Sequence, residues 1–244
     1  MGGNDGPSED EAAISQAVVA VADAQNADDV EAFLALVTDN YIIDTFSPPP
    51  ARDQLRQQGL TAAGEPPVEF SDIENFTVSD EAATVEGWQR MAKGASRVEI
   101  SLIREGDAWL LDGWKTLKID TPDGATEVGV ETVDNLYRFP SDENTFPAGD
   151  LALQVANIGA QEHNLFLVKL PEGVSVEEAY DVADPADVGA EYSGLFGSVQ
   201  PRSAATWLLE GLEPGRYGYF CWVWDPRQGA VHALLGMAGE FTVE

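Results

Sequence analysis

Both histidines of this chain, its single cysteine and one of its three methionines carry side chains that bind soft transition metals. His163 lies in the apolar segment EHNLFLVKL, Cys221 ends the segment GRYGYFC, and the other two follow in CWVWDPRQGAVHALLGM. Sulfur ligands suit Cu(I), and imidazole suits either oxidation state of copper. We therefore expect a mononuclear type 1 copper centre with His163, Cys221 and His232 as ligands. Met237 is expected to be its weak axial ligand.

The interval between Cys221 and His232 is ten residues long, WVWDPRQGAV. Asp225, Pro226 and Gly229 are typical turn residues, so we expect the interval to fold back and return His232 to the metal. The alternative is that the interval keeps His232 away from Cys221. That arrangement would leave a copper-free module that serves binding or cell-surface interaction.

The elements that must position these residues are strands. Residues 131–244 contain short segments rich in β-branched and aromatic residues, separated by Gly and Pro, which predicts a β-sandwich. The expected strands are ETVDNLYRF, DLALQVANIG, EHNLFLVKL, SAATWLLEGL, GRYGYFCWV and GEFTVE. The stretch SVEEAYDVADPADVGAEY, between the third and the fourth of them, is expected to be helical at its start.

Three segments of this half resemble the cupredoxins, the family of plastocyanin, azurin and halocyanin. They are FPAGDLALQVANIGAQEHNLFLV, LEPGRYGYFC and HALLGMAGEFTV, in the order found in that family. The resemblance implies a Greek-key sandwich, one-electron transfer, and a role for Asn164 in tying the His163 strand to the Cys221 loop. It also implies a redox partner protein that docks near His232. The following residues either form that docking patch or fill the end of the sandwich: Ala233, Leu234, Leu235 and Gly236.

Residues 11–120 combine helices with strands, which predicts an α+β domain with its helices on one face of a curved antiparallel sheet. The sequence SEDE at residues 8–11 is a capping box, and the apolar residues after it repeat at helical spacing. A second helix is expected in NADDVEAFLALV, with Asn26 as its cap, and a short one in DQLRQQGL. The expected strands are VEFSDIENFTVS, EAATVEGWQRMA, SRVEISLIREG and AWLLDGWKTLKID. Residues 1–10 are expected to be a polar tether and 121–130 a linker.

The first half of the chain resembles the nuclear-transport-factor-two-like superfamily of cone-shaped domains, which includes polyketide cyclases and steroid isomerases. The resemblance rests on the segments ADDVEAFLALVTDNYI and ISLIREGDAWLLDGWK. It implies an internal pocket lined by Tyr41, Asp44, Trp88 and Asp112. Because a carboxylate beside a tyrosine can transfer protons, an enzyme acting on a small apolar molecule is an alternative function. A scaffold or homodimerisation role is the default, because such folds host many functions.

The chain is strongly acidic, with 43 acidic and 13 basic residues and a formal net charge of −30. Acidic residues are spread along both halves, so we expect the whole surface to be acidic. This composition resembles that of proteins from extremely halophilic archaea, in which high salt screens the self-repulsion. An acidic mesophilic protein is the alternative. Nucleic-acid binding is excluded, because it requires clustered Lys and Arg.

The sequence also indicates where the protein works. It has no apolar segment long enough to span a bilayer. A single cysteine cannot form an intramolecular disulfide, and copper ligation accounts for a free thiol in an exported protein. The opening MGGNDGPSEDE resembles the polar tether that follows the lipidated cysteine of prokaryotic lipoproteins. We therefore expect an extracytoplasmic protein, at the cell surface or secreted, with an export signal and a lipid anchor in its precursor.

Overall fold

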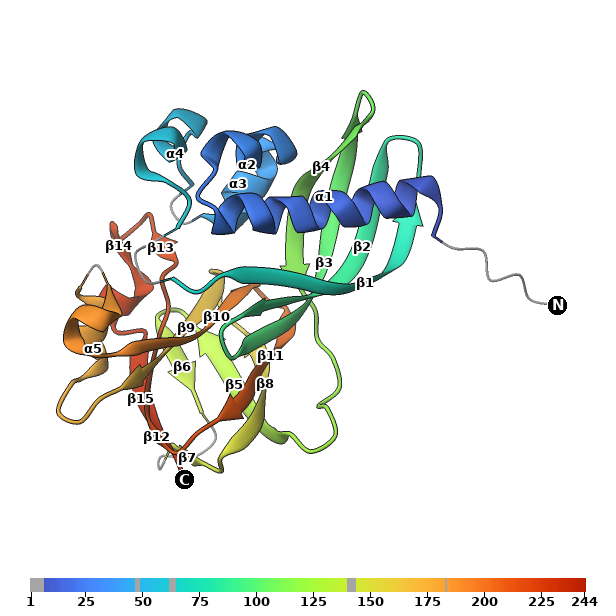
Figure 1. The fold of residues 1–244 in the computed structure, drawn as a ribbon. Helices are drawn as coiled ribbons and strands as arrows, with labels where there is room; N and C mark the ends of the chain where they lie inside the picture. The colour runs from blue at the N-terminus through green and yellow to red at the C-terminus, as the bar shows by residue number, and fades with distance from the viewer. Residues whose placement is uncertain (1–6, 47–48, 62–64, 140–143, 183) are drawn as a thin grey trace. The chain divides into compact units, whose positions relative to one another are not determined.

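The computed structural model describes residues 7–46, 49–61, 65–139, 144–182 and 184–244 (Figure 1). The chain forms two compact units. The first consists of Met1–Thr61, Val68–Trp88 and Val98–Trp114, and the second of Ala62–Pro67, Gln89–Arg97 and Lys115–Glu244. Among the described residues, no helix is both long enough and apolar enough to cross a membrane.

The first unit opens with helix α1 (Glu9–Asn26), which begins at the expected capping box. The hydroxyl oxygen of Ser8 accepts the N–H of Glu11, and the Glu11 carboxylate accepts the N–H of Ser8. A cap of this kind contributes about 1 kcal/mol to the stability of a helix. The apolar face of α1 is buried, as its spacing predicted, through Ile14, Ala17, Val18 and Val21. Three short helices follow: α2 (Val30–Leu36), α3 (Asp39–Thr45) and α4 (Arg52–Gln58).

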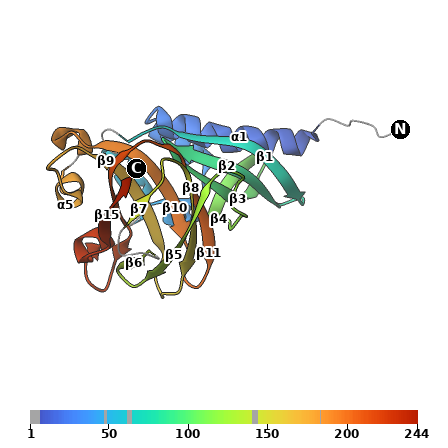
Figure 2. The ribbon, with the colours of Figure 1, turned by 90° about the horizontal axis from the view of Figure 1, so that it is seen from below.

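The strands of the first unit pair in the order β1-β2-β3-β4. Their bounds are β1 (Val68–Val78), β2 (Ala82–Met91), β3 (Gly94–Glu105) and β4 (Ala108–Thr116). Apolar side chains alternate along them, and those on one face form a core with the helices that includes Val85, Ile100 and Leu111. Helix α1 runs along this sheet (Figure 2). The expected packing of helices on one face of a sheet is therefore present.

Two details of the first unit differ from the expectations. Asn26 does not cap α2; the cap is Asp29, whose carboxylate accepts the N–H of Ala32 at 3.0 Å. The Asn26 side chain instead bonds both the N–H and the carbonyl of Val68, each at 2.8 Å, so it ties the end of α1 to the start of β1. Helix α3 was not expected, because seven residues are too few to show a helical repeat.

The second unit contains two larger sheets, with strand orders β11-β8-β5-β6 and β10-β9-β12-β15-β7. Neighbouring strands are antiparallel, except for the parallel pairs β5–β8 and β7–β15. The bounds in the first sheet are β5 (Thr126–Val133), β6 (Leu136–Arg138), β8 (Gly149–Asn157) and β11 (Ala204–Leu212). In the second they are β7 (Thr145–Phe146), β9 (His163–Leu170), β10 (Glu191–Val199), β12 (Gly215–Phe220) and β15 (Ala238–Val243). The short helices α5 (Val176–Tyr180) and η1 (Pro185–Val188) lie between β9 and β10 in the chain.

The two sheets share one hydrophobic core. Alternate residues of β8, among them Leu151 and Leu153, join it from one sheet, and Leu165 and Leu167 of β9 join it from the other. Trp207 is completely buried in this core, and its indole N–H donates to the carbonyl of Gly197 at 3.1 Å. The core therefore has the two-layer construction of a sandwich.

Several elements of the second unit differ from the predicted strands. The segment ETVDNLYRF is not one strand: β5 begins earlier, at Thr126, and Asp134, with φ of 48°, turns the chain into β6. Strand β5 thus begins inside the segment 121–130 that was expected to be a linker. Strand β10 was not expected: the stretch SVEEAYDVADPADVGAEY was expected to be helical at its start, and its last two residues, Glu191 and Tyr192, begin β10.

Residues 89–97, at the turn between β2 and β3, are part of the second unit. Gly94 and Ala95 pair with Leu209 and Leu208 of β11, and the N–H of Lys93 donates to the carbonyl of Ser193 at 2.9 Å. The turn is thus hydrogen-bonded to one strand from each of the two larger sheets, β11 and β10.

Candidate metal centre

One end of the sheet β10-β9-β12-β15 brings together segments that are far apart in the sequence. Strand β9 begins at His163, β12 ends just before Cys221, and β15 begins just after Met237. Strand β12 is antiparallel to both β9 and β15, and Phe220 pairs with Ala238. Antiparallel neighbours place the end of one strand beside the start of the next. The register therefore places these three expected ligands at the same end of one sheet.

The ten-residue interval after Cys221 folds back on itself as a small hairpin. Its strands are β13 (Trp224–Asp225) and β14 (Ala230–Val231). The N–H of Gly229 donates to the carbonyl of Asp225 at 2.8 Å, and Gly229 has φ of 67°, a conformation that glycine adopts without strain. His232 follows the hairpin, begins the short helix η2 (His232–Leu235), and donates its N–H to the carbonyl of Val223 at 2.8 Å. The long interval thus returns His232 to the neighbourhood of Cys221.

The side chains of His163, Cys221 and His232 converge on one point. The two imidazole Nδ1 atoms are 3.2 Å apart, and the Cys221 Sγ lies 3.4 Å from Nδ1 of His232 and 4.0 Å from Nδ1 of His163. The point equidistant from three such atoms lies about 2.1 Å from each, close to the usual lengths of metal–imidazole and metal–thiolate bonds. In the described part of the chain, this is the one group of three or more potential ligand side chains close enough to share an ion.

All three side chains are fully buried, at 0% exposure. Burial lowers the pKa of His163 to about 3, and the charge of His232 adds to that shift. Burial also lowers the pKa of His232, and it raises the pKa of the Cys221 thiol to about 12. Without a metal, both imidazoles are therefore neutral at pH 7, which is the state that binds a metal, and the thiol is protonated.

The two imidazoles face each other through their Nδ1 atoms, and their distal ring nitrogens lie on the opposite side of each ring. Nε2 of His163 and Nε2 of His232 are buried, and neither has a hydrogen-bond partner among the described residues. Two neutral imidazoles whose Nδ1 atoms face each other can share only one N–H there, so at least one Nε2–H is left unpaired. A buried unpaired donor costs about 1–3 kcal/mol. The facing Nδ1 atoms fit a shared metal ion, which would bind both lone pairs and leave both Nε2 atoms protonated. The unpaired Nε2 atoms themselves are not explained by the metal.

The Cys221 sulfur is surrounded by hydrogen-bond donors. They are the backbone N–H groups of Asn164 and Val223 and the hydroxyl of Tyr137. The single proton of the Tyr137 hydroxyl has two acceptors, the Cys221 sulfur and the carbonyl of Asn164. The Asn164 side-chain oxygen accepts the N–H of Trp222 at 2.9 Å. Asn164 therefore connects the segments that contain His163 and Cys221, the position expected for it. Tyr137 was not expected, because it is distant in the sequence and has no motif of its own.

Met237 is also fully buried and belongs to the same core cluster as Cys221. Its carbonyl accepts the N–H of Cys221 at 3.1 Å, and its own N–H donates to the carbonyl of His232 at 2.9 Å. The backbone of Met237 is thus bonded directly to two of the three converging residues.

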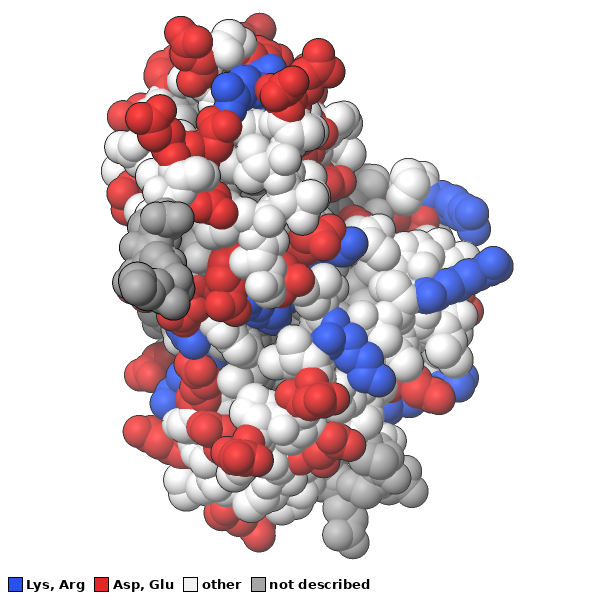
Figure 3. Space-filling model, turned by 90° about the vertical axis from the view of Figure 1, so that its right-hand side faces the viewer, with Lys and Arg blue, Asp and Glu red and all other residues white. Residues whose placement is uncertain are grey.

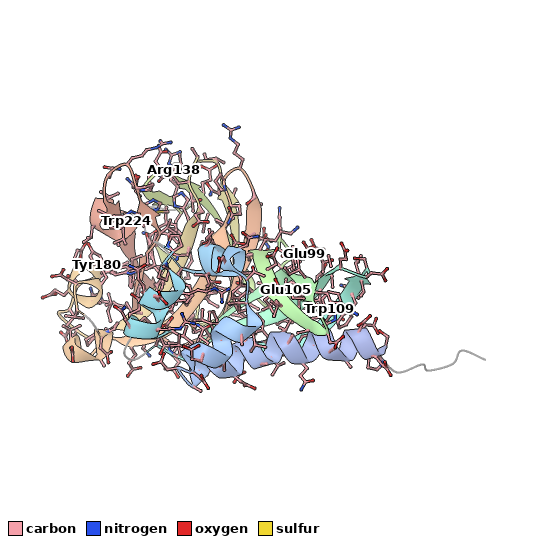
Figure 4. The ribbon with its side chains drawn as sticks, turned by 90° about the horizontal axis from the view of Figure 1, so that it is seen from above. Glu99, Glu105, Trp109, Arg138, Tyr180 and Trp224 are labelled. Carbon is pink, nitrogen blue, oxygen red and sulfur yellow. The ribbon has the colours of Figure 1, made fainter. Side chains whose placement is uncertain are left out.

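The surface near His232 combines buried and exposed apolar residues. Ala233 is buried in a satellite cluster, whereas Leu234 is 60% exposed. Trp224 of the hairpin, labelled in Figure 4, is 36% exposed. The stretch 233–236 therefore both fills the interior and presents an apolar side chain to solvent. Because His232 itself is buried, a partner molecule would contact these neighbours rather than its ring.

Two of the residues expected to line a pocket in the first unit, Asp112 and Tyr41, make hydrogen bonds with neighbouring side chains. The Asp112 carboxylate accepts hydrogen bonds from the Thr38 hydroxyl at 2.7 Å and the Asn40 amide at 3.2 Å. Tyr41 is buried, and its hydroxyl bonds Thr45; its burial raises its pKa.

The other two members of that set are less buried. Asp44 is exposed but partly desolvated, which raises its pKa, and its carboxylate lies against Gly113. Trp88 is half-buried in β2. These contacts give no acid–base pair, so the four residues remain a prediction.

Comparison with known proteins gives matches among solved structures alone: no protein-family model and no curated protein matches the chain. A dithionite-reduced auracyanin from the photosynthetic bacterium Roseiflexus castenholzii is 27% identical over 50% of this chain and 99% of its own, with a TM-score of 0.35. Auracyanin A, a "blue" copper protein from Chloroflexus aurantiacus, is 19% identical over 50% of this chain and 100% of its own, with a TM-score of 0.32. An NTF-2 like protein of unknown function from Shewanella oneidensis is 16% identical over 44% of this chain and 96% of its own, with a TM-score of 0.33. The structural neighbours thus include members of both families that the sequence resembles.

Proposed function

We propose that this protein is a type 1 copper protein that transfers single electrons. The observation that supports the proposal most directly is the convergence of one thiol and two imidazole Nδ1 atoms, all fully buried, at separations of 3.2–4.0 Å. One soft sulfur and two imidazoles can bind both Cu(I) and Cu(II), so a bound copper ion would supply a one-electron couple. His163, Cys221 and His232 would hold the ion, with Met237 as the axial ligand.

The chain's own residues prepare the site for this role. Burial keeps the imidazoles neutral and excludes water. The ends of β9, β12 and β15 hold His163, Cys221 and Met237 on one sheet, and the hairpin after Cys221 holds His232. Donors around the Cys221 sulfur stabilise its thiolate form. A site held this rigidly changes little between two oxidation states, which is what fast electron transfer requires.

The partner in this proposal is a redox protein that docks near His232. Leu234 and Trp224 are exposed apolar side chains on the segments next to His232, and Ala233 is buried. The electron would pass between the buried site and the partner through these segments. We place the protein outside the cytoplasm. Its cysteine is compatible with that oxidising environment, because ligation to a metal leaves no free thiol to oxidise.

For the first unit we propose a scaffold or dimerisation role. Its expected pocket residues are engaged in local hydrogen bonds, notably Asp112 with Thr38 and Tyr41 with Thr45. An enzymatic role would need Asp44 or Asp112 as an ionisable group. If an enzymatic activity is detected, the variants Asp44→Asn and Asp112→Asn test this alternative, which predicts that turnover is lost in one of them.

The experiment that tests the copper proposal is a Cu(II) titration of the metal-free, reduced protein, followed by visible absorption and electron paramagnetic resonance. We expect an intense thiolate-to-copper band with narrow hyperfine splitting at one equivalent of copper. The variant Cys221→Ser should lose the band and remain folded. If the folded wild-type protein develops no such band, the copper proposal is wrong and a copper-free binding module takes its place.

A further inference from the structure

The hairpin that returns His232 to the site contains a buried acidic residue, Asp225, which is only 3% exposed. Its Oδ1 accepts the backbone N–H of Arg227 at 2.7 Å and that of Gln228 at 3.3 Å, and its Oδ2 accepts the side-chain amide of Gln228 at 3.2 Å. An aspartate that bonds the N–H two residues later closes a turn in place of a backbone contact. Asp225 therefore holds together the tip of the hairpin.

The same carboxylate reaches the other histidine segment. The side chain of Gln161, two residues before His163, donates a hydrogen bond to Asp225. Gln161 is itself held, because its carbonyl accepts the side-chain amide of the buried Asn157 at 2.7 Å. One carboxylate thus bonds both chain segments that deliver an imidazole to the site.

The charge state of Asp225 suits this double role. The hydrogen bond from Gln161, together with those from Arg227 and Gln228, lowers the pKa of the Asp225 carboxyl to about 2. The side chain is therefore a carboxylate throughout the neutral range, and it accepts hydrogen bonds on both oxygens at once.

We propose that Asp225 is a positioning residue that links the hairpin of His232 to the Gln161 segment of His163 and so holds the two imidazoles at metal-binding separation before the metal arrives. A ten-residue interval without such a link would have to be ordered during binding, and that entropy would weaken metal affinity. The link removes most of this cost in advance. This inference rests on the proposed metal site and assigns a residue that the ligand set does not include.

The test compares Asp225→Ala, Gln161→Ala and the double variant with the wild-type protein. Loss of an outer partner of a ligand typically lowers metal affinity by roughly 10–100-fold, and we expect Asp225→Ala to fall in that range. The absorption band should also shift and the hyperfine splitting widen, because the His232 imidazole is no longer held in place. The two single effects should not add in the double variant, since both remove the same bond. Asp225→Asn, which keeps one acceptor oxygen, should recover part of the affinity.

Asp184→Ala is the matched control. Asp184 makes the same kind of turn contact, accepting the N–H of Ala186 at 2.9 Å, but it lies at the start of η1 and not on a histidine segment. Its removal should leave the copper affinity and both spectra unchanged.

A second readout needs no copper. Nitrogen-15 NMR of the imidazoles in the metal-free protein should show one fixed environment for His163 and His232 in the wild type and averaged or shifted signals in Asp225→Ala. If Asp225→Ala does not fold, Gln161→Ala provides the same comparison. A wild-type protein without the blue band overturns the proposed function. A wild-type protein with the band, together with unchanged affinity, spectra and imidazole signals in the variants, overturns this inference alone.

Discussion

At the residue scale, the donors around the Cys221 sulfur are the feature that most directly governs the chemistry of the proposed site. Two of them are backbone N–H groups, which every sequence supplies, but the third is the hydroxyl of Tyr137. That hydroxyl has one proton and two acceptors, the Cys221 sulfur and the Asn164 carbonyl. A thiolate attracts the proton more strongly than a thiol does, so this hydrogen bond favours the more negative state of the sulfur.

Tyr137→Phe is expected to lower the reduction potential of the copper-loaded protein. The reduced site carries one more negative charge than the oxidised site, so a lost donor destabilises the reduced state more. The measurement is a redox titration that follows the blue band, which should itself shift. Tyr217→Phe is the control, because it removes the same atom from the same core, where the hydroxyl donates to the carbonyl of Glu213. Equal potentials for the two variants would contradict the prediction.

The buried His163 makes the stability of the metal-free protein depend on pH. In the unfolded chain this imidazole takes up a proton near pH 6.5, whereas in the folded protein its pKa is about 3. Between these values the unfolded state binds more protons, so stability falls as the pH falls through this window. Chemical unfolding from pH 7.5 to 5.5 should show this loss in the wild type and a flatter profile in His163→Asn. Parallel profiles would show that the imidazole is protonated in the folded state.

At the element scale, close contacts between backbones determine where side chains are tolerated. A Cβ on Gly194 of β10 would lie 3.1 Å from the backbone N and 3.2 Å from the Cα of Gly94 in β3. These are backbone atoms, which cannot rotate away as a side chain can. A Cβ on Gly129 of β5 would meet nothing within 4 Å. Gly194 and Gly129 are therefore present for different reasons.

Gly194→Ala is expected to destabilise the second unit by about 1–3 kcal/mol, the usual cost of overpacking. Gly129→Ala, its matched control, should be neutral or slightly stabilising, because alanine reduces the entropy of the unfolded chain without a clash. Urea unfolding monitored by tryptophan fluorescence distinguishes them. Similar midpoints for the two variants would show that β3 and β10 separate easily at this point.

At the scale of the whole molecule, the charge is the dominant property. On the face drawn in Figure 3, acidic side chains are spread over much of the surface, with basic ones among them. Several of the basic residues form surface ion pairs, such as Arg56 with Glu31 and Arg216 with Glu240. Exposed pairs of this kind contribute little each, so they offset only a small part of a net charge of −30.

Added salt is therefore expected to stabilise the protein. The Debye length shortens from about 10 Å at 0.1 M to about 3 Å at 1 M salt, which screens repulsion between neighbouring carboxylates. Thermal unfolding should shift to higher temperature as KCl rises over this range, and most of the gain should come at low concentration. A melting temperature independent of KCl would indicate that the surface charges are already well separated.

Much of this protein follows from its sequence alone. The four chemistry-bearing residues and their order were evident from residue types, because one cysteine and two histidines leave few other ligand sets. The capping box of α1 and most strands were predicted because caps and alternation are local patterns. The acidic surface is a matter of composition. The assignment of copper itself remains a prediction.

What the sequence did not determine depends on contacts between distant segments. The return of His232 to Cys221 depends on a hairpin that Asp225 closes, and the link of that hairpin to Gln161 spans 64 residues (225 minus 161). Strand β10 and the position of Tyr137 beside Cys221 depend on register and packing, which no local pattern encodes. Burial of both imidazoles, which sets their pKa values, likewise exists only once the sheets have closed over them. Local propensity thus determines the elements, whereas the tertiary structure determines which side chains meet.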